Sequence, residues 1–312
     1  MERNDVFDLS QIESKPVGWI PTGLYTLDYC FSGKVELVIE GGKIITSVKG
    51  GVPRGLMSLW AGQAGIGKSR MLIFMSSLIN ISTRNKILYI QNEVNGTQFK
   101  QWVDGFNSQL RNYGQACGHA GWLDAIDTSR FLMSNATDYH RHLEIIEQHR
   151  PDLVIVDSVN MLEGFNSSSQ IRQMLTSYKN VTSNIDAHTI LVGHLAKDGT
   201  IKGSTDVPHL VDIVVNLHRD KYIGDDYINI DSLFFLTVGK NRVGPSGEWI
   251  CVQHTDSGID IEPGNPSSSL QYKNIKGEFQ EEAARLSKQV KGYKQPRKGF
   301  LDALGGIMGI GE

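Results

Sequence analysis

Residues 56–74, with the sequence LMSLWAGQAGIGKSRMLIF, place the pattern G-x-x-x-x-G-K-[ST] between two apolar runs. The first run is short and continuous, as in a buried strand, and the second continues as an apolar helix. The glycines let backbone N–H groups close around phosphates, and the start of the helix carries a partial positive charge that favours anions. The order strand, glycine loop, helix therefore predicts a nucleotide site.

The residue types in this loop assign the parts of the site. Lys68 is expected to reach the β- and γ-phosphates, and the Ser69 hydroxyl is expected to hold Mg²⁺. We therefore expect ATP and Mg²⁺ as ligands. The expected nucleotide-binding residues are Gly62, Gln63, Ala64, Gly65, Ile66, Gly67, Lys68, Ser69 and Arg70.

The rest of the chain alternates between strand and helix patterns, which predicts an α/β fold with a mostly parallel central sheet and helices on both faces. A glycine turn between two alternating apolar runs predicts a hairpin at 34–48. The expected divisions are an N-terminal arm at 1–17, a core at 18–263 containing that hairpin, and a linker, helix and apolar tail at 264–312. The expected strands are 56–61, 87–91, 153–157, 189–193, 213–217 and 232–239, and the expected helices are 69–81, 97–113, 138–149 and 169–185.

Composition bounds the function classes. The 312 residues are 40% hydrophobic and 21% charged, without an apolar run near ~18 residues, so neither a membrane span nor export is indicated. Three scattered cysteines suit a reducing cytoplasm. The net charge of −3 means that any charge for binding nucleic acid must be local. Three nearby histidines, His140, His142 and His149, are expected on a solvated helix face.

Three polar residues end apolar strand patterns and are expected at the edge of the sheet where ligands bind. Asp157 follows the run LVIV and would support Mg²⁺. Glu93 follows another strand and is placed to activate the attacking water, although a carboxylate there could also cap a helix. His194 would sense the γ-phosphate, although a lone histidine is more often structural.

Lys240 and Arg242 lie at i and i+2 in a turn after the strand pattern at 232–239. Such a pair is either ordinary surface charge or a set of cationic fingers that enter a neighbouring subunit's nucleotide site. The spacing alone leaves both interpretations open.

Several motifs together resemble the RecA-fold ATPases of the RadA, DnaB and KaiC groups. IPTG at 20–23 and GVPRG at 51–55 resemble the approach to their glycine loop, and YIQNE at 89–93 resembles their strand with the catalytic glutamate. Within this set, VGHLAKDGTIKG at 192–203, HLVD at 209–212 and KNRVG at 240–244 resemble RadA (Sms). The continuation PSG at 245–247 is closer to DnaB. The resemblance covers about residues 18–262.

The resemblance implies a homo-oligomeric, ATP-driven DNA motor, a ring or a filament, acting in recombination, repair or replication. Lys240 and Arg242 would contact ATP held by the adjacent protomer. Two loops, Asn160–Gln170 and Lys197–Pro208, would bind single-stranded DNA in a central channel. The expected DNA-binding residues are Lys197, Lys202, Ser204 and Thr205.

The chain also departs from these families. RadA proteins carry a four-cysteine zinc finger and a Lon-like domain, and DnaB proteins carry a collar domain, and none of these is found in this sequence. The size of such a minimal motor core is compatible with a phage-encoded protein in the host cytoplasm. The alternatives are a DnaB-type replicative helicase core, a strand-exchange recombinase, and a KaiC-like regulatory ATPase that does not bind DNA. The apolar segment 299–312 is expected to bind a partner protein or an adjacent protomer.

Overall fold

The computed structural model describes residues 16–22, 25–33, 37–40, 43–46, 50–117, 126–163, 167–195, 207–223, 226–229, 233–255 and 258–263. The expected arm (apart from residues 16 and 17) and the expected C-terminal segment 264–312 lie outside this range, as do residues 196–206.

The described residues form five longer helices and a large sheet, with small paired strands at the periphery. The helices are α1 (Tyr25–Ser32), α2 (Lys68–Thr83), α3 (Gly96–Cys117), α4 (Tyr139–His149), α5 (Ser168–Asn184) and the short α6 (Val207–Leu210), with 3₁₀ turns η3 (Thr128–Arg130) and η4 (Val159–Met161). The strands of the large sheet are β5 (Met57–Gly62), β6 (Ile87–Gln91), β7 (Phe131–Ser134), β8 (Leu153–Asp157), β9 (His188–His194), β10 (Ile213–His218), β13 (Leu233–Asn241), β14 (Trp249–Thr255) and β15 (Gly258–Pro263).

Nine described strands pair in the order β15-β14-β13-β10-β5-β9-β8-β6-β7. The six strands from β10 to β7 are parallel to their neighbours, whereas β13, β14 and β15 pair antiparallel. The predicted mostly parallel α/β sheet is therefore confirmed. Because the six strands share one direction, their carboxyl ends meet at the same edge, where ligands of such sheets bind.

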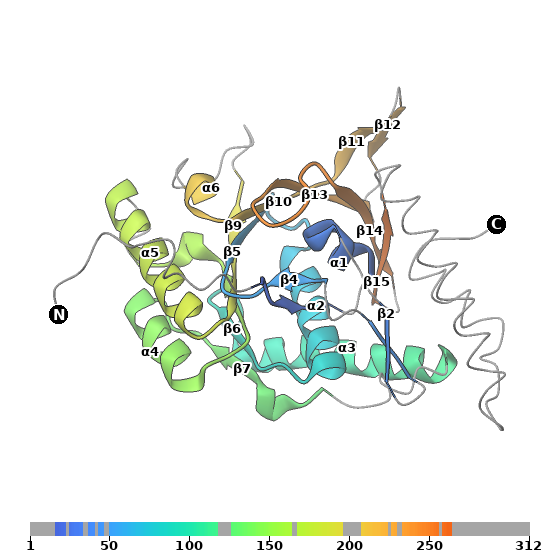
Figure 1. Ribbon diagram of the computed structural model, residues 1–312, viewed down its shortest axis with the longest axis horizontal. Coiled ribbons are helices and arrows are strands. Elements are labelled where there is room, and N and C mark those ends of the chain that lie inside the picture. Colours follow the sequence, from blue (N-terminus) through green and yellow to red (C-terminus); the bar gives the residue numbers. More distant parts are fainter. Residues whose placement is uncertain are drawn as a thin grey trace.

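Helices cover both faces of this sheet. Helices α4 and α5 lie on one face, whereas α1, α2 and α3 lie on the other, where the antiparallel end of the sheet curves around them (Figure 1). Each face has its own apolar core: one includes Phe31, Trp60 and Leu72, and the other includes Leu59, Ile146 and Tyr178. The alternating sides of β5 supply both cores, because Trp60 and Leu59 point to opposite faces.

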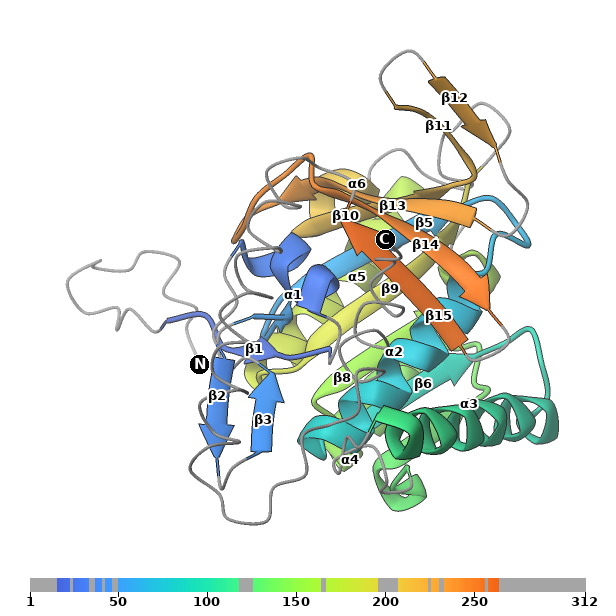
Figure 2. The same cartoon turned by 90° about the vertical axis from the view of Figure 1, so that its right-hand side faces the viewer.

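Small strand pairs flank the large sheet. β1 (Trp19–Ile20) pairs antiparallel with β4 (Val52–Pro53), and β2 (Leu37–Glu40) pairs antiparallel with β3 (Lys43–Thr46), at the position of the expected hairpin. β11 (Asp220–Ile223) and β12 (Asp226–Asn229) form a further antiparallel pair that extends away from the body of the sheet (Figure 2).

One expectation about the helices is wrong. His142 does not lie on a solvated face: its side chain is fully buried, with one ring nitrogen against the Tyr178 hydroxyl and the other 2.8 Å from the Ala136 carbonyl oxygen. These two partners satisfy both ring nitrogens, so the ring can join the packing of α4 against α5. Burial lowers the pKa of His142, which keeps the ring neutral.

None of the described helices combines the length and the apolar character needed to cross a bilayer.

Candidate nucleotide-binding and hydrolysis site

The glycine loop joins β5 to α2 in the expected geometry. Gly65 and Gly67 have φ values of 74° and 102°, in the left-handed region that glycine adopts without strain. Gly67 is the N-cap of α2 and makes no side-chain capping bond. The first N–H groups of α2 thus face the loop, which forms an anion-binding end of a helix.

Lys68 lies inside this loop. Its ammonium donates to the carbonyl oxygens of Gly62 and Gln63, each at 2.9 Å, and the side chain is buried. Burial lowers the pKa of Lys68, and the nearby Asp157 and Glu93 carboxylates partly offset this change. The Lys68 ammonium is therefore held by the loop carbonyls, near enough to the Asp157 and Glu93 carboxylates for both to affect its pKa.

Asp157, at the end of β8, faces the loop and is almost fully buried. Its Oδ2 accepts a hydrogen bond from the buried Tyr89 hydroxyl at 2.8 Å, and the Ser69 side chain also hydrogen-bonds to the carboxylate. Burial raises the pKa of Asp157, with a contribution from Glu93, while hydrogen bonds from Ser69 and Tyr89 oppose the rise.

This arrangement fits Mg²⁺. A buried carboxylate with a raised pKa, in contact with a hydroxyl, gains from a bound cation, and Mg²⁺ in nucleotide sites uses few protein oxygens besides phosphate and water. Ser69 and Asp157 would hold the ion, whose role when bound is to neutralise charge on the phosphates. No cluster of three or more His, Cys, Asp or Glu side chains that could hold a metal was found among the described residues.

Glu93 and His194 meet across the same edge. His194 Nε2 lies 3.0 Å from Glu93 Oε1, and the Ser158 hydroxyl donates to the same oxygen at 3.3 Å. The strand register explains the meeting: Gln91 pairs with Asp157, Asp157 with Val192, and Gly62 with His194. The Glu93 carboxylate is nearly half exposed, so water can reach it.

Backbone contacts fix these strand ends. The Gln91 side chain is buried and accepts hydrogen bonds from the backbone N–H groups of Glu93 and Val94. The Asn160 side chain accepts from the His194 N–H at 2.7 Å. Glu93 and His194 are therefore each held through the backbone N–H group by a neighbouring polar side chain.

Arg70 and the tip of the loop behave differently. Gln63, Ala64, Gly65 and Arg70 are exposed, and the Arg70 guanidinium lies 5.8 Å from the centre of the Phe106 ring on α3. Contacts of these residues with a nucleotide remain predictions.

The structure does not bring Lys240 and Arg242 to this site. β13 runs antiparallel to β10, so Asn241 pairs with Ile213, which in turn pairs with Ser58 near the start of β5. The glycine loop begins at Gly62, about 13 Å further along the strand at about 3.3 Å per residue. The two cations therefore lie at the opposite edge of the sheet from the glycine loop of their own chain.

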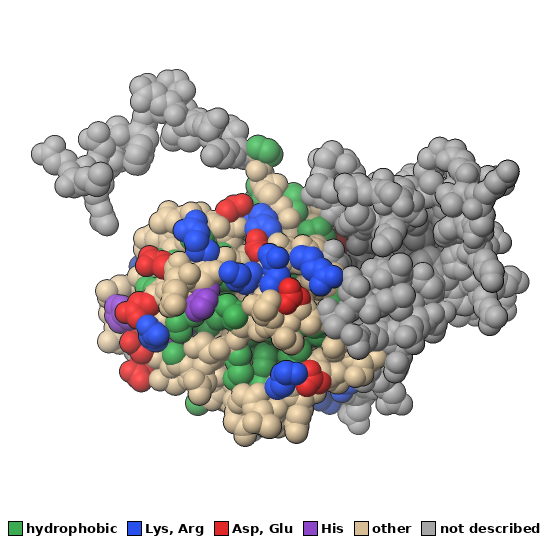
Figure 3. Space-filling view, turned by 90° about the horizontal axis from the view of Figure 1, so that it is seen from below, with side chains coloured by type: hydrophobic (Ala, Val, Ile, Leu, Met, Phe, Trp, Pro, Cys, Tyr) green, Lys and Arg blue, Asp and Glu red, His purple; other side chains and the backbone are tan. Residues whose placement is uncertain are grey.

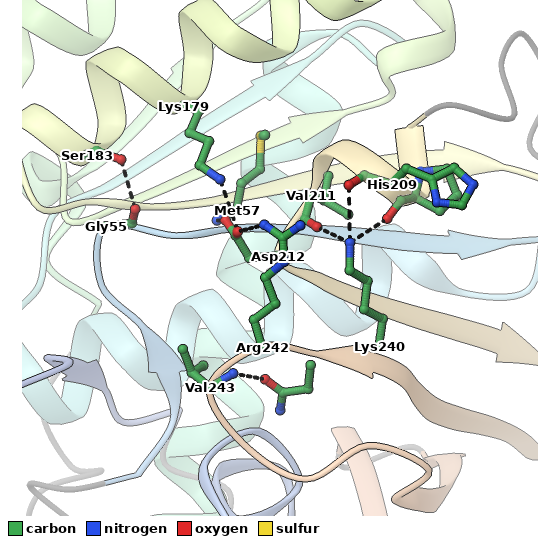
Figure 4. A network of polar contacts seen from close by, with 12 residues as sticks. Gly55, Met57, Lys179, Ser183, His209, Val211, Asp212, Lys240, Arg242 and Val243 are labelled. Atoms are coloured by element: carbon green, nitrogen blue, oxygen red, sulfur yellow. Dashed lines mark hydrogen bonds and ion pairs between the residues drawn. The ribbon is translucent and has the colours of Figure 1, made fainter. Parts of the chain in front are cut away.

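At that edge both cations have partners within the chain (Figure 4). The Lys240 ammonium donates to the carbonyl oxygens of Pro208, His209 and Val211, at 2.9, 3.3 and 2.6 Å. These are carbonyls at the end of α6, which lack partners within the helix. Arg242 Nη1 donates to Asp212 Oδ1 at 2.8 Å, and its side chain is 52% exposed.

Asn241, which stands between these two cations at the end of β13, shapes the turn that follows. Its Oδ1 accepts from the N–H groups of Val243 and Gly244, each at 3.1 Å, and its Nδ2 donates to the Phe31 carbonyl oxygen at 2.8 Å. The turn is thereby anchored on the end of α1.

The expected DNA-binding loops are only partly described. The first includes η4, where the Met161 side chain is 54% exposed, and resumes at α5. Lys197, Lys202, Ser204 and Thr205 lie outside the described residues.

The surface that lies underneath in Figure 1 is a separate feature. On this face, described basic and acidic side chains are interspersed, with hydrophobic side chains between them (Figure 3). The described part of that face therefore presents a mixture of charges, not a broad basic surface.

Sequence reasoning missed several residues of the site. Tyr89, Ser158 and Asn160 touch the predicted groups, but these contacts follow only from the pairing of β6, β8 and β9, whereas the contacts of Gln91 with the Glu93 and Val94 N–H groups are local. At the other edge, Lys179 was missed, and Asp212 was noted only as part of the motif HLVD, without a role. A carboxylate and a lysine 33 residues apart give no spacing signal.

Comparisons with known proteins agree with this geometry. A family model described as an AAA domain matches residues 46–200. The DNA repair protein RadA of Mycobacterium tuberculosis is 29% identical over 224 residues, covering 69% of this chain and 42% of that protein. RadA of Aquifex aeolicus is 26% identical over 220 residues, covering 69% and 43%. RadA of Streptococcus pyogenes is 27% identical over 234 residues, covering 73% and 45%.

The fold and sequence of this chain resemble those of RecA-fold, RadA-like ATPases. The chain spans less than half the length of the RadA proteins that it matches.

Proposed function

We propose that this chain hydrolyses ATP with Mg²⁺ and uses the energy to move on single-stranded DNA in repair or recombination. The observation that carries the proposal is the meeting of Lys68, Ser69, Asp157, Glu93 and His194 at one edge of the sheet. RadA relatives that are named as DNA repair proteins support the choice of DNA as partner.

Each residue has a part in the proposed hydrolysis. The glycine loop and Lys68 bind the β- and γ-phosphates, and Ser69 and Asp157 hold the metal. Glu93 accepts a proton from the attacking water, for which an exposed carboxylate beside the loop is placed. His194 contacts Glu93 beside the glycine loop, and it is followed directly in the chain by the expected DNA loop. His194 is therefore placed to pass a change at the γ-phosphate on to that loop.

We further propose that Arg242 acts on ATP bound by a neighbouring copy of the chain. Two facts support this: Arg242 lies at the far edge from its own glycine loop, and half of its side chain is exposed. A missing arginine finger lowers the rate by ~10³–10⁵-fold. That Lys240 also reaches the neighbouring nucleotide stays a prediction, because in this chain its ammonium already meets three carbonyl oxygens.

Mixing two inactive variants tests the trans arrangement. Arg242→Ala keeps a good glycine loop, and Lys68→Ala keeps a good finger. In a random equal mixture about a quarter of the interfaces combine the two intact parts, so activity should rise to about a quarter of the wild-type rate. If mixing never raises the rate above that of the separate variants, Arg242 does not act across an interface.

The DNA part of the proposal needs a separate test. We propose that Lys197 and Lys202 contact the DNA backbone, with Ser204 and Thr205 beside them. Each lost phosphate contact on a single strand lowers the slope of log K against log salt by ~0.7. The double variant Lys197→Ala, Lys202→Ala should therefore bind an oligothymidylate more weakly and with a shallower slope. An unchanged slope would move the DNA site elsewhere, and no binding by the wild type would favour a regulatory ATPase.

A second candidate, a DnaB-type helicase core, is favoured by the sequence PSG at 245–247. Unwinding of a forked duplex in the presence of ATP would support it, whereas DNA-stimulated hydrolysis without unwinding would favour a RadA-like motor.

A further inference from the structure

Asp212 lies at the centre of a group of cations at the far edge of the sheet (Figure 4). Its Oδ1 accepts from Lys179 Nζ at 3.0 Å and from Arg242 Nη1 at 2.8 Å. Lys179 comes from α5 and Arg242 from the turn after β13, so the carboxylate joins two elements that are separate in the chain. Neither α5 nor the turn alone would place its cation beside the other.

The backbone holds Asp212 firmly at the start of the glycine-loop strand. The Asp212 N–H donates to the Met57 carbonyl oxygen at 2.9 Å, and the Met57 N–H donates to Asp212 Oδ2 at 3.1 Å. The carboxylate is only 4% exposed. Burial by itself would raise the pKa of Asp212, but hydrogen bonds from Lys179, Met57 and Arg242 outweigh it and lower the pKa. The Asp212 carboxylate, which anchors the group, is therefore ionised and held in place by its hydrogen bonds.

The cations around this anchor exceed its charge. Lys179, Lys240 and Arg242 contribute three positive charges and Asp212 one negative charge, which leaves a net +2 in this group. The three cations lie close together, because Lys179 and Arg242 contact Asp212 and the Lys240 ammonium donates to the carbonyl oxygen of the preceding residue, Val211. Burial lowers the pKa of Lys240, and the charges of Arg242 and Lys179 lower it further. A group with a net charge of +2 is stabilised by a bound anion that carries several negative charges.

Exposure decides which cations can meet that anion. The side chains of Lys179 and Arg242 are 38% and 52% exposed, and each makes one described ion pair, with Asp212 Oδ1. An ammonium has three N–H donors and a guanidinium five, so both keep donors free to face outward. The Lys240 ammonium, in contrast, is used by three carbonyl oxygens.

We propose that Lys179 is a further binding residue for the triphosphate of a nucleotide held by a neighbouring copy, and that Asp212 is the positioning residue that sets Lys179 and Arg242 side by side. This inference rests on the proposed ATP hydrolysis between subunits. Without the Asp212 carboxylate, the Lys179 ammonium and the Arg242 guanidinium would repel each other, and Arg242 would no longer be held in one orientation. The ligand class is the polyphosphate tail of a nucleoside triphosphate.

Lys179→Met, with Lys179→Arg as the matched control, tests the binding role. Lys179→Met should lower kcat by about tenfold to a hundredfold, because it removes a positive charge that would stabilise the transferring phosphoryl group. The KM for ATP should change little, because the glycine loop of the same chain is intact. Lys179→Arg should restore most of kcat.

Mixing experiments separate this role from a structural one. Lys179→Met should complement Lys68→Ala, whose defect lies on the other side of the interface. It should not complement Arg242→Ala, because both defects lie on the same side. In the Asp212→Asn background, Arg242→Ala should cause little further loss of kcat, whereas independent effects would multiply.

Failure of this inference can be distinguished from failure of the proposed function. If Arg242→Ala is inactive while Lys179→Met hydrolyses ATP at the wild-type rate, Lys179 does not bind the triphosphate. If Lys179→Met complements Arg242→Ala, the two cations do not serve one site, and the proposal is overturned. If the wild type does not hydrolyse ATP, the proposed function itself fails.

Discussion

His188 and Asp28 should give the stability of this protein two opposing pH dependences. His188 is fully buried, and its ring nitrogens lie 2.7 Å from the Pro53 carbonyl oxygen and 2.9 Å from the Ser58 hydroxyl. Burial lowers the pKa of His188 from 6.5 to about 4. The unfolded chain therefore binds the proton first, so this histidine removes stability as the pH falls from about 6.5 towards about 4.

Asp28 acts in the opposite direction. Its Oδ1 accepts two hydrogen bonds from Thr22, at 2.8 and 2.6 Å, while its buried Oδ2 has no partner among the described residues. Burial raises the pKa of Asp28 from 3.8 to about 7. The folded chain therefore binds this proton first, and the stability that it contributes at low pH is lost as the pH rises towards about 7.

The sizes of the two effects follow from these pKa values. Between pH 7.5 and pH 5, His188 should remove about 2 kcal/mol of unfolding free energy, and protonation of Asp28 should add about 2–3 kcal/mol. The two contributions nearly cancel in the wild type. Single substitutions should uncover them: His188→Gln should gain stability on acidification, and Asp28→Asn should lose it.

Urea unfolding at the two pH values measures this directly. Each variant is compared with itself, so any constant cost of the substitution cancels. The change in unfolding free energy on acidification should differ between the two variants by about 4–5 kcal/mol. If both variants follow the pH dependence of the wild type, neither buried group titrates as described.

Three further substitutions, one of them with a control in helix α3, probe the two edges of the sheet. Gly244→Ala should cost about 1–3 kcal/mol or more of stability, because its Cβ would lie 2.0 Å from the Phe31 carbonyl oxygen, whereas Gly105→Ala, with open space around it, should be neutral or slightly stabilising. Equal urea midpoints for the two would contradict this. Tyr89→Phe should lower the unfolding free energy by about 1–3 kcal/mol and raise the Mg²⁺ concentration needed for hydrolysis, since the buried Asp157 loses a donor. An unaltered Mg²⁺ titration would argue against Asp157 as a metal ligand. Lys68→Ala should abolish hydrolysis with an unchanged circular dichroism spectrum, and residual turnover would place the phosphates elsewhere.

The nucleotide edge could be predicted from the sequence because its logic is local. A glycine loop between a strand and a helix needs no knowledge of distant contacts, and parallel strands bring their carboxyl ends together whatever their order. Asp157, Glu93 and His194 were therefore expected together, and His194 and Glu93 indeed lie 3.0 Å apart. The contact of Tyr89 with Asp157 could not be predicted in this way, because it depends on which strands are neighbours.

The opposite edge could not be predicted for a related reason. An apolar run shows a strand but not its direction, and the antiparallel course of β13 is what carries Lys240 and Arg242 away from their own glycine loop. The joining of α5 to the turn after β13 through Asp212 likewise depends on the order of strands. His142 was misplaced because sequence patterns do not reveal that Tyr178 and the Ala136 carbonyl satisfy its ring.

ATP turnover with and without single-stranded DNA, measured for the wild type and Glu93→Gln, tests the proposed function most directly. The wild type should hydrolyse ATP, and DNA should raise the rate. Glu93→Gln should bind a fluorescent ATP analogue like the wild type and hydrolyse ATP about 10²–10⁴-fold more slowly, because the loop still binds phosphate and the base is gone. Wild-type turnover by Glu93→Gln, or a wild-type rate that DNA does not change, would contradict a DNA motor driven from this site.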